Sequence, residues 1–139
     1  MMEYKDIAKK TIGHLYLAHT SIRSSGIDTK LIALVELYVS QVNGCAYCCA
    51  FHAQELREMG ITQELIDKIP GYKHSSAFTP QQSIVLEWAE AVITLSERID
   101  TLKTQLRDYF NDREIVELTA SISLMGALNR LRITLADKT

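Results

Sequence analysis

Apolar residues recur every three to four positions along most of this chain, which is the spacing of one face of an α-helix. From Tyr4 to about Thr20 they fall at positions 4, 7, 8, 12, 15 and 16, and no strong alternation typical of a β-strand occurs. Only two prolines and six glycines interrupt the chain. The pattern therefore predicts an all-α protein.

Turn residues end the first helical segment at positions 24–26, and Asp28 is suited to cap the helix that follows. That helix is expected over about residues 29–42. Its LIALVELYV stretch is apolar nearly all round, so we expect this helix to be buried near the centre of the fold.

The Asn43-Gly44 dipeptide signals a turn before a third helix, expected over about residues 45–59 with Gly60 as its stop. A short helical piece is expected over residues 63–69. The GYKHSSAF segment after it has the composition of a loop.

Capping signals mark the later helices. Thr79 opens a long helix, with proline at its first position and a Thr-x-x-Gln capping box. A shorter helix is expected over about residues 101–110. Asn111 with Glu114 caps the last helix, which is expected to end near Leu135.

Composition bounds the class of protein. The length of 139 residues suits one domain over residues 1–139, and we expect it to contain five to seven helices. Fifteen basic and seventeen acidic residues leave a net charge of −2. We therefore do not expect a nucleic-acid partner. The absence of an apolar signal core or a membrane-length apolar run favours a cytoplasmic protein with no membrane partner.

The three cysteines lie together in the segment VNGCAYCCAFH, as Cys45, Cys48 and Cys49. A C-x-x-C pair can close a disulfide reversibly or hold a metal. The cytosol keeps thiols reduced, so catalysis or metal binding is favoured over a structural disulfide. Both sulfurs of the pair fall in the first turn of the expected helix, where unpaired N–H groups and the helix dipole stabilise a thiolate.

His52 lies four residues after Cys48 and therefore on the same helix face. It lies seven residues after Cys45, roughly 10 Å along the axis at about 1.5 Å per residue. Because a base beside a thiol activates a nucleophile, we expect Cys48 to attack and Cys45 to resolve the product as a disulfide. Cys49 points away from this face and is expected to act as a small buried apolar residue.

Other interpretations of these residues remain open. The pair with His52 and a distant histidine could bind a metal, but a structural zinc site usually takes four ligands and no second C-x-x-C or H-x-x-x-H occurs. We therefore expect no metal and no organic cofactor. The remaining histidines, His14, His19 and His74, show no partner pattern and are expected at the surface or at an interface. The aromatic residues Tyr47, Phe51 and Trp88 are expected in the core or at an interface.

The stretch SQVNGCAYCCAFHAQELREMG resembles the signature of the carboxymuconolactone decarboxylase superfamily, in its alkylhydroperoxidase D-like (AhpD-like) branch. That signature is C-x-x-C, three residues, His, seven residues, Gly, and Cys45, Cys48, His52 and Gly60 fit every spacing. The stretches FTPQQSIVLEWAEAVITL and LMGALNRLRITL are similar to later helices of the same proteins.

The resemblance implies an all-helical fold that assembles into homo-oligomers, as trimers or hexamers. It implies a thiol-dependent peroxidase in which the second cysteine attacks and the first resolves, which agrees with the roles given above to Cys48 and Cys45. The namesake decarboxylases generally lack the C-x-x-C, which argues against decarboxylation.

One position departs from the family pattern. The peroxidases place a Glu twelve residues before the first cysteine to relay a proton through the His, and here that residue is Ala33. Glu36, three residues later, is the charged residue inside LIALVELYV. Glu36 either replaces the missing Glu as a catalytic residue, or faces solvent or a partner subunit.

The leading hypothesis is a cytosolic peroxidase that takes a peroxide substrate and a dithiol or protein reductant. A general dithiol–disulfide oxidoreductase without peroxide specificity is the nearest alternative. A non-enzymatic oligomeric stress-response protein with an idle C-x-x-C is the next.

Overall fold

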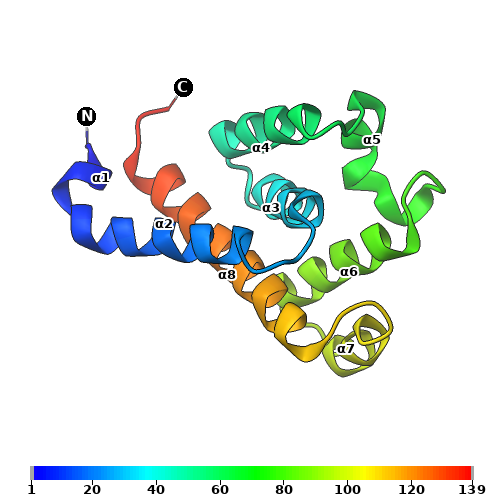
Figure 1. Ribbon diagram of the computed structural model, residues 1–139. Coiled ribbons are helices and arrows are strands. Elements are labelled where there is room, and N and C mark those ends of the chain that lie inside the picture. Colours follow the sequence, from blue (N-terminus) through cyan, green and yellow to red (C-terminus); the bar gives the residue numbers. More distant parts are fainter. Residues whose placement is uncertain (1, 139) are drawn as a thin grey trace.

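The computed structural model describes residues 2–138, and these form an all-helical fold without a strand (Figure 1). The expected all-α class is thereby confirmed. The described residues contain eight α-helices and one 3-10 helix, namely α1 (Tyr4–Ile7), α2 (Lys9–Arg23), α3 (Thr29–Asn43), α4 (Ala46–Glu58), α5 (Gln63–Lys68), η1 (Ile69–His74), α6 (Pro80–Thr94), α7 (Ile99–Leu106) and α8 (Asp112–Leu135).

The expected helix caps are present. The Asp28 carboxylate accepts the N–H of Lys30 at 2.9 Å at the start of α3. Thr79 and Gln82 exchange both bonds of a capping box before α6, and Asn111 and Glu114 do the same before α8. Local side-chain chemistry thus sets where these helices begin, as the sequence predicts.

Two segments differ from expectation because tertiary contacts override local pattern. The first helical segment breaks at Ala8, whose φ of −116° and ψ of 52° are not helical, so α1 turns back and buries Tyr4. This break adds a helix to the expected five to seven. The GYKHSSAF segment is not a loop throughout, since η1 extends to His74. Tyr72 in η1 is buried, and its hydroxyl donates to Glu90 at 2.9 Å, which holds the segment against α6.

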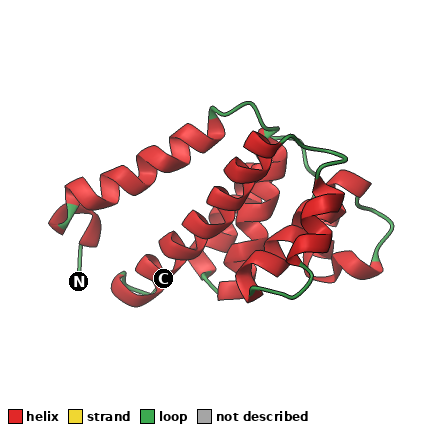
Figure 2. Cartoon of the chain, turned by 90° about the horizontal axis from the view of Figure 1, so that it is seen from below, coloured by secondary structure: helices red, strands yellow, loops and turns green. Residues whose placement is uncertain are grey.

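Helix α3 forms the centre of the fold, as its apolar sequence predicts. Residues 31–40 are all buried. The helix packs against α4, α6 and α8, and Figure 1 shows it almost end-on between them. Burying a Leu or Ile side chain contributes about 1.5–3 kcal/mol, so the buried apolar residues of α3 contribute substantially to core stability. Helix α2 lies along α8 at the edge of the bundle (Figure 2).

A tight turn folds α4 back against α3. Gly44 has φ 72° and ψ 30°, the left-handed conformation that ends many helices, and the Cys45 N–H donates to the Ser40 carbonyl at 3.0 Å. Cys45 is therefore the N-cap of α4. This turn places the cysteine pair beside α3 and α8.

A buried polar network ties α8 to α3. The Asn129 side chain donates to the Ser40 hydroxyl at 3.1 Å and accepts from the Asn43 amide at 3.1 Å. The Ser40 hydroxyl donates to the Glu36 carbonyl at 2.8 Å. These bonds fix the register of the two helices that flank the cysteine pair. No helix among the described residues is long and apolar enough to cross a membrane.

Candidate active site

Cys45 and Cys48 are joined by a disulfide at the start of α4, with their Cα atoms 5.2 Å apart. Both residues are buried, and the Cys45 sulfur also accepts the backbone N–H of Cys48 at 3.3 Å. A sulfur at this position faces the unpaired N–H groups of the first turn, which favour a thiolate after reduction. Cys49 is half-buried against the core, and burial raises the pKa of its thiol.

His52 lies one turn after Cys48 and is also buried. Its Nδ1 lies 3.2 Å from a Glu55 oxygen and 3.3 Å from a Glu36 oxygen. When Nδ1 carries a proton it can donate to these carboxylates, which leaves Nε2 as the basic nitrogen. Among the described residues, Nε2 has no hydrogen-bond partner, so it remains available to a thiol or to a substrate.

Glu36 is the carboxylate that reaches His52 from α3. It is fully buried, with 0% of its surface exposed, so it does not face solvent. Ala33, where the family places its Glu, is also fully buried and one turn earlier in the same helix. A buried carboxylate is stable only when it is paired and hydrogen-bonded.

Arg23, the last residue of α2, supplies the pairing charge. Its guanidinium donates to both oxygens of Glu36 at 3.2 Å each, and to both oxygens of Glu55 at 3.1 and 2.8 Å. Burial acts to lower the pKa of Arg23, but its hydrogen bonds and the charges of both carboxylates outweigh this and raise it. Arg23 therefore holds α2, α3 and α4 together through a permanent positive charge.

Glu55 completes the cluster from the far side of His52. Burial acts to raise the pKa of its carboxyl, but hydrogen bonds from His52 and Arg23 and their charges lower the pKa to about 2. Glu55 is therefore ionised throughout the physiological range. With it, the His52 imidazole lies between two carboxylates that are bridged by one guanidinium.

His19 differs from the expected surface or interface position. It is half-buried on α2, and its Nε2 lies 3.3 Å from a Glu36 oxygen. His14 and His74 are exposed. Glu36 is thus approached by cationic or polar nitrogen groups of Arg23, His19 and His52, from two different helices.

Sequence reasoning missed Arg23, Glu55 and His19, although each left a signal. Glu55 follows His52 by three residues and so shares its helix face. His19 and Arg23 are four residues apart on one face of α2. A lone Glu inside an apolar helix demands a cationic partner, but sequence alone does not say which basic residue supplies it.

A metal has a possible ligand set here in Glu36, His52 and Glu55, each of which offers an atom within 4.8 Å of the others. The Arg23 guanidinium already bridges the two carboxylates of this set. A cation would therefore have to displace Arg23 or remain close to it. The donor set fits an internal ion-pair cluster better than a metal site.

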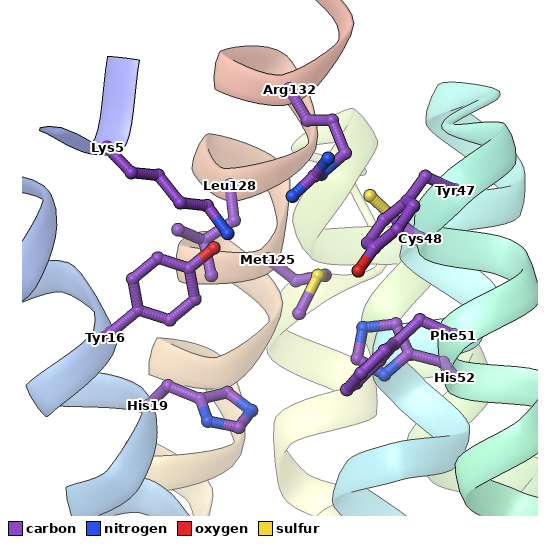
Figure 3. Close-up of a pocket in the computed structure, with 10 residues that line it drawn as sticks. All are labelled: Lys5, Tyr16, His19, Tyr47, Cys48, Phe51, His52, Met125, Leu128 and Arg132. Carbon is purple, nitrogen blue, oxygen red and sulfur yellow. The ribbon is translucent and has the colours of Figure 1, made fainter. Parts of the chain in front are cut away.

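A cavity of about 260 Å³ opens onto the Cys48 and His52 side of α4. Figure 3 shows it between α4, α8 and the two N-terminal helices, with the side chains of all four elements directed into it. Its lining comprises Lys5, Tyr16, His19, Tyr47, Cys48, Phe51, His52, Met125, Leu128 and Arg132. The cavity gives a small molecule access to the side of Cys48, the residue that the sequence analysis expects to be the nucleophile.

The aromatic residues of the motif line this cavity and do not enter the core. Tyr47 and Phe51 stack with their ring centroids 6.4 Å apart, and about half of each side chain is exposed. The Phe51 ring also meets His52 edge-on at 5.2 Å. Trp88, by contrast, is a core residue whose N–H donates to Thr119 at 2.9 Å.

Comparison with known proteins identifies similar sequences. The model of the Carboxymuconolactone decarboxylase family matches residues 10–91. The uncharacterized protein YdfG of Bacillus subtilis (strain 168) is 25% identical over 139 residues, which covers 99% of this chain and 95% of YdfG.

Solved structures share the fold. A protein of unknown function from Agrobacterium tumefaciens, described as a putative antioxidant defence protein AhpD, is 27% identical with a TM-score of 0.91, covering 99% of this chain and 95% of its own. A peroxidase-related protein from Silicibacter sp. TM1040 is 19% identical with a TM-score of 0.82, covering 93% of this chain and 70% of its own. The second likeness concerns the fold alone.

Proposed function

This chain belongs to the carboxymuconolactone decarboxylase family, in its AhpD-like branch, and on that premise we propose that it reduces hydroperoxides with the Cys45–Cys48 pair. The observation that carries the proposal is the His52 imidazole, held between two carboxylates one turn from Cys48 at the wall of an accessible cavity. The putative antioxidant role of the Agrobacterium relative supports the same reaction class.

The reaction begins with the reduced dithiol. The Cys48 thiolate attacks the terminal peroxide oxygen, the O–O bond breaks, and the alkoxide leaves as an alcohol with a proton supplied through His52. Cys48 is then a sulfenic acid. The Cys45 thiol attacks that sulfur, the disulfide forms and water leaves. A dithiol reductant finally returns both cysteines to thiols and is itself oxidised to a disulfide.

The cluster behind His52 has a defined part in this scheme. Glu36 takes the place of the Glu that the family carries at the position of Ala33, and Arg23 keeps its charge stable in the buried site. With Nδ1 directed at Glu36 and Glu55, Nε2 is the nitrogen of His52 that can exchange a proton with Cys48 or with the peroxide. The proposal places the protein in the cytosol, where dithiol reductants are available.

The test is peroxide consumption driven by dithiothreitol, measured in the parent and in three cysteine variants. Cys48→Ser should lose turnover, and Cys45→Ser should complete one attack and leave Cys48 as a trappable sulfenic acid. Cys49→Ser is the matched control and should turn over like the parent. If Cys45→Ser cannot react at all while Cys48→Ser can, the assigned roles are reversed.

A second assay separates the nearest alternative. A general dithiol–disulfide oxidoreductase would reduce a protein disulfide such as that of insulin with the same cysteine dependence, and would do so faster than it consumes peroxide. A parent protein that does neither, with a thiol count unchanged by stoichiometric peroxide, would contradict both enzymatic functions.

A further inference from the structure

Two cationic side chains line the cavity of Cys48 without a function in the scheme above. Lys5 reaches it from α1, and Arg132 from the last turns of α8 (Figure 3). Within residues 2–138, neither forms an ion pair with a carboxylate, whereas Arg23 is fully paired. The chain thus keeps two positive charges at this cavity that a ligand could neutralise.

Aromatic rings hold both charged groups in place. The Arg132 guanidinium lies 3.9 Å from the centroid of the Tyr47 ring, and the Lys5 ammonium lies 4.9 Å from that of Tyr16. Cation–π contacts of this kind orient a charge while leaving its N–H donors free. All four side chains line the same cavity.

Different parts of the cavity wall therefore offer different chemistry to a ligand. Cys48 and His52 lie on α4, while Met125 and Leu128 of α8 form an apolar wall. Lys5 and Arg132 also line an adjoining cavity of about 270 Å³, whose wall includes the carboxylates of Glu3 and Asp137. These two carboxylates do not line the cavity that holds Cys48, so its own charged lining beside the His52 cluster is positive.

We propose that this cavity selects organic hydroperoxides that carry a carboxylate. The carboxylate binds Arg132 and Lys5, the hydrocarbon part packs on Met125 and Leu128, and the peroxide reaches Cys48. The inference rests on the proposed peroxidase function and names its substrate class. A cavity of about 260 Å³ lies just below the size typical of sites for drug-sized ligands, which favours acids no larger than a substituted benzene.

The chemistry of the step is that of the peroxidase. The Cys48 sulfur takes the terminal oxygen and the O–O bond breaks. The hydroperoxy acid leaves as the corresponding hydroxy acid, and the dithiol reductant supplies the two electrons. The carboxylate is unchanged and contributes only binding, which appears in kcat/KM. Charge-assisted hydrogen bonds to such a group are among the stronger ones in proteins.

The test compares two probes, an acid and its methyl ester, that differ in the negative charge and in one methyl group. These are 4-(2-hydroperoxypropan-2-yl)benzoate and its methyl ester, with the neutral reductant dithiothreitol in every assay. The parent should prefer the acid by about tenfold in kcat/KM, which corresponds to about 1.4 kcal/mol, because only the acid can form charge-assisted hydrogen bonds with Arg132 and Lys5. The preference should shrink as salt is added.

Variants locate the source of the preference. Arg132→Gln and Lys5→Gln should each bring the acid-to-ester ratio toward one, whereas Arg132→Lys, which keeps the charge, should retain most of it. Arg107→Gln is the matched control. This arginine is exposed in the connection between α7 and α8, pairs with Asp112 and does not line the cavity. The inference would be overturned if the acid-to-ester ratio of kcat/KM were the same in the parent and in the Arg132 and Lys5 variants. It would also be overturned if Arg107→Gln lowered that ratio as much as they do.

A binding measurement keeps the two proposals separable. Calorimetry on the disulfide form with 4-(2-hydroxypropan-2-yl)benzoate, the product acid, should show binding that its methyl ester lacks and that Arg132→Gln weakens about tenfold. Consumption of both hydroperoxides without an acid preference contradicts the selectivity alone. Consumption of neither contradicts the peroxidase function, and the calorimetric comparison then still decides whether the cavity selects carboxylates.

Discussion

At the scale of single residues, the imidazole of His52 owes its position to charges on three helices. Glu36 comes from α3, Glu55 from α4 and Arg23 from α2, and none of them is a cysteine-motif residue. Because the buried Glu36 and the half-buried Glu55 are paired with one guanidinium, they act on His52 without the cost of an unpaired buried charge.

Replacing Glu36 with Gln should change the pH dependence of Cys48 alkylation in the reduced protein. If Glu36 acts through His52, losing its charge destabilises the imidazolium and moves the alkylation profile to higher pH, by about half to one unit. A direct effect of the lost negative charge on the thiolate would move the profile to lower pH. Rates of alkylation measured across pH, with the fold checked by circular dichroism, distinguish the two.

The control is Glu58→Gln, which removes an exposed carboxylate from α4, the helix that carries Cys48. Its profile should match that of the parent. Superimposable profiles for Glu36→Gln and the parent would reduce Glu36 to a structural residue.

Glu55 should make the folded state sensitive to acid. Its pKa of about 2 in the folded protein lies below the ordinary value of 4.5, so its stabilising contribution is complete above about pH 4.5 and is lost as the pH falls toward 2. Between pH 6 and pH 3, the free energy of unfolding of the parent should fall further than that of Glu55→Gln, by at most about 2 kcal/mol. Urea unfolding of both proteins at the two pH values measures this difference, and equal falls would refute it.

At the scale of secondary-structure elements, the α3–α4 turn brings the cysteine pair to the core. Gly44 has a positive φ of 72°, and a Cβ added to it would meet nothing within 4 Å. Any effect of a side chain there must therefore come from backbone strain and not from a clash.

Gly44→Ala should lower the free energy of unfolding by about 1–2 kcal/mol, the cost of the left-handed conformation for a residue with a Cβ. Gly71→Ala is a matched control, since Gly71 has a negative φ of −107° and equally open surroundings. It should change stability by no more than about 0.5 kcal/mol. Denaturant unfolding of the disulfide forms compares them, and a Gly44→Ala protein as stable as Gly71→Ala would contradict the strain argument.

Elements with strong local signals were predictable, and those set by distant contacts were not. The caps at Asp28, Thr79 and Asn111 are formed by residues within three positions of each helix start, so the sequence contains them in full. The break at Ala8 accompanies the burial of Tyr4, and because alanine itself favours a helix, no local signal marks it. The same contrast holds in the site: the Cys48–His52 spacing is local, whereas the approach of Arg23 to Glu36 depends on how α2 packs.

At the scale of the whole molecule, several large apolar side chains remain on the surface. Ile7, Leu17, Val116 and Leu95 are each between 63% and 79% exposed. Tyr47 and Phe51 add aromatic surface beside the cavity. An apolar share of 47% in a chain of this size exceeds what one small fold easily buries.

We therefore expect the protein to form homo-oligomers, as trimers or hexamers in line with the family resemblance. Burial of these side chains between subunits provides the driving force. Sedimentation velocity at micromolar concentration should give a mass that is a multiple of the chain mass of 15.7 kDa. A monomeric mass at that concentration would be decisive against this expectation.

The bridging of Glu36 and Glu55 by Arg23 also bears on how such sequences diverge. Arg23 and Glu36 are thirteen residues apart and lie on different helices, yet without Arg23 the buried Glu36 carboxylate would keep only the nitrogens of His19 and His52 as partners. Substitutions at the two positions should therefore covary among relatives. Where the acid lies at the position of Ala33 and position 36 is not acidic, the arginine at 23 loses one of its two carboxylate partners, and an alignment of such lineages should show position 23 substituted more often.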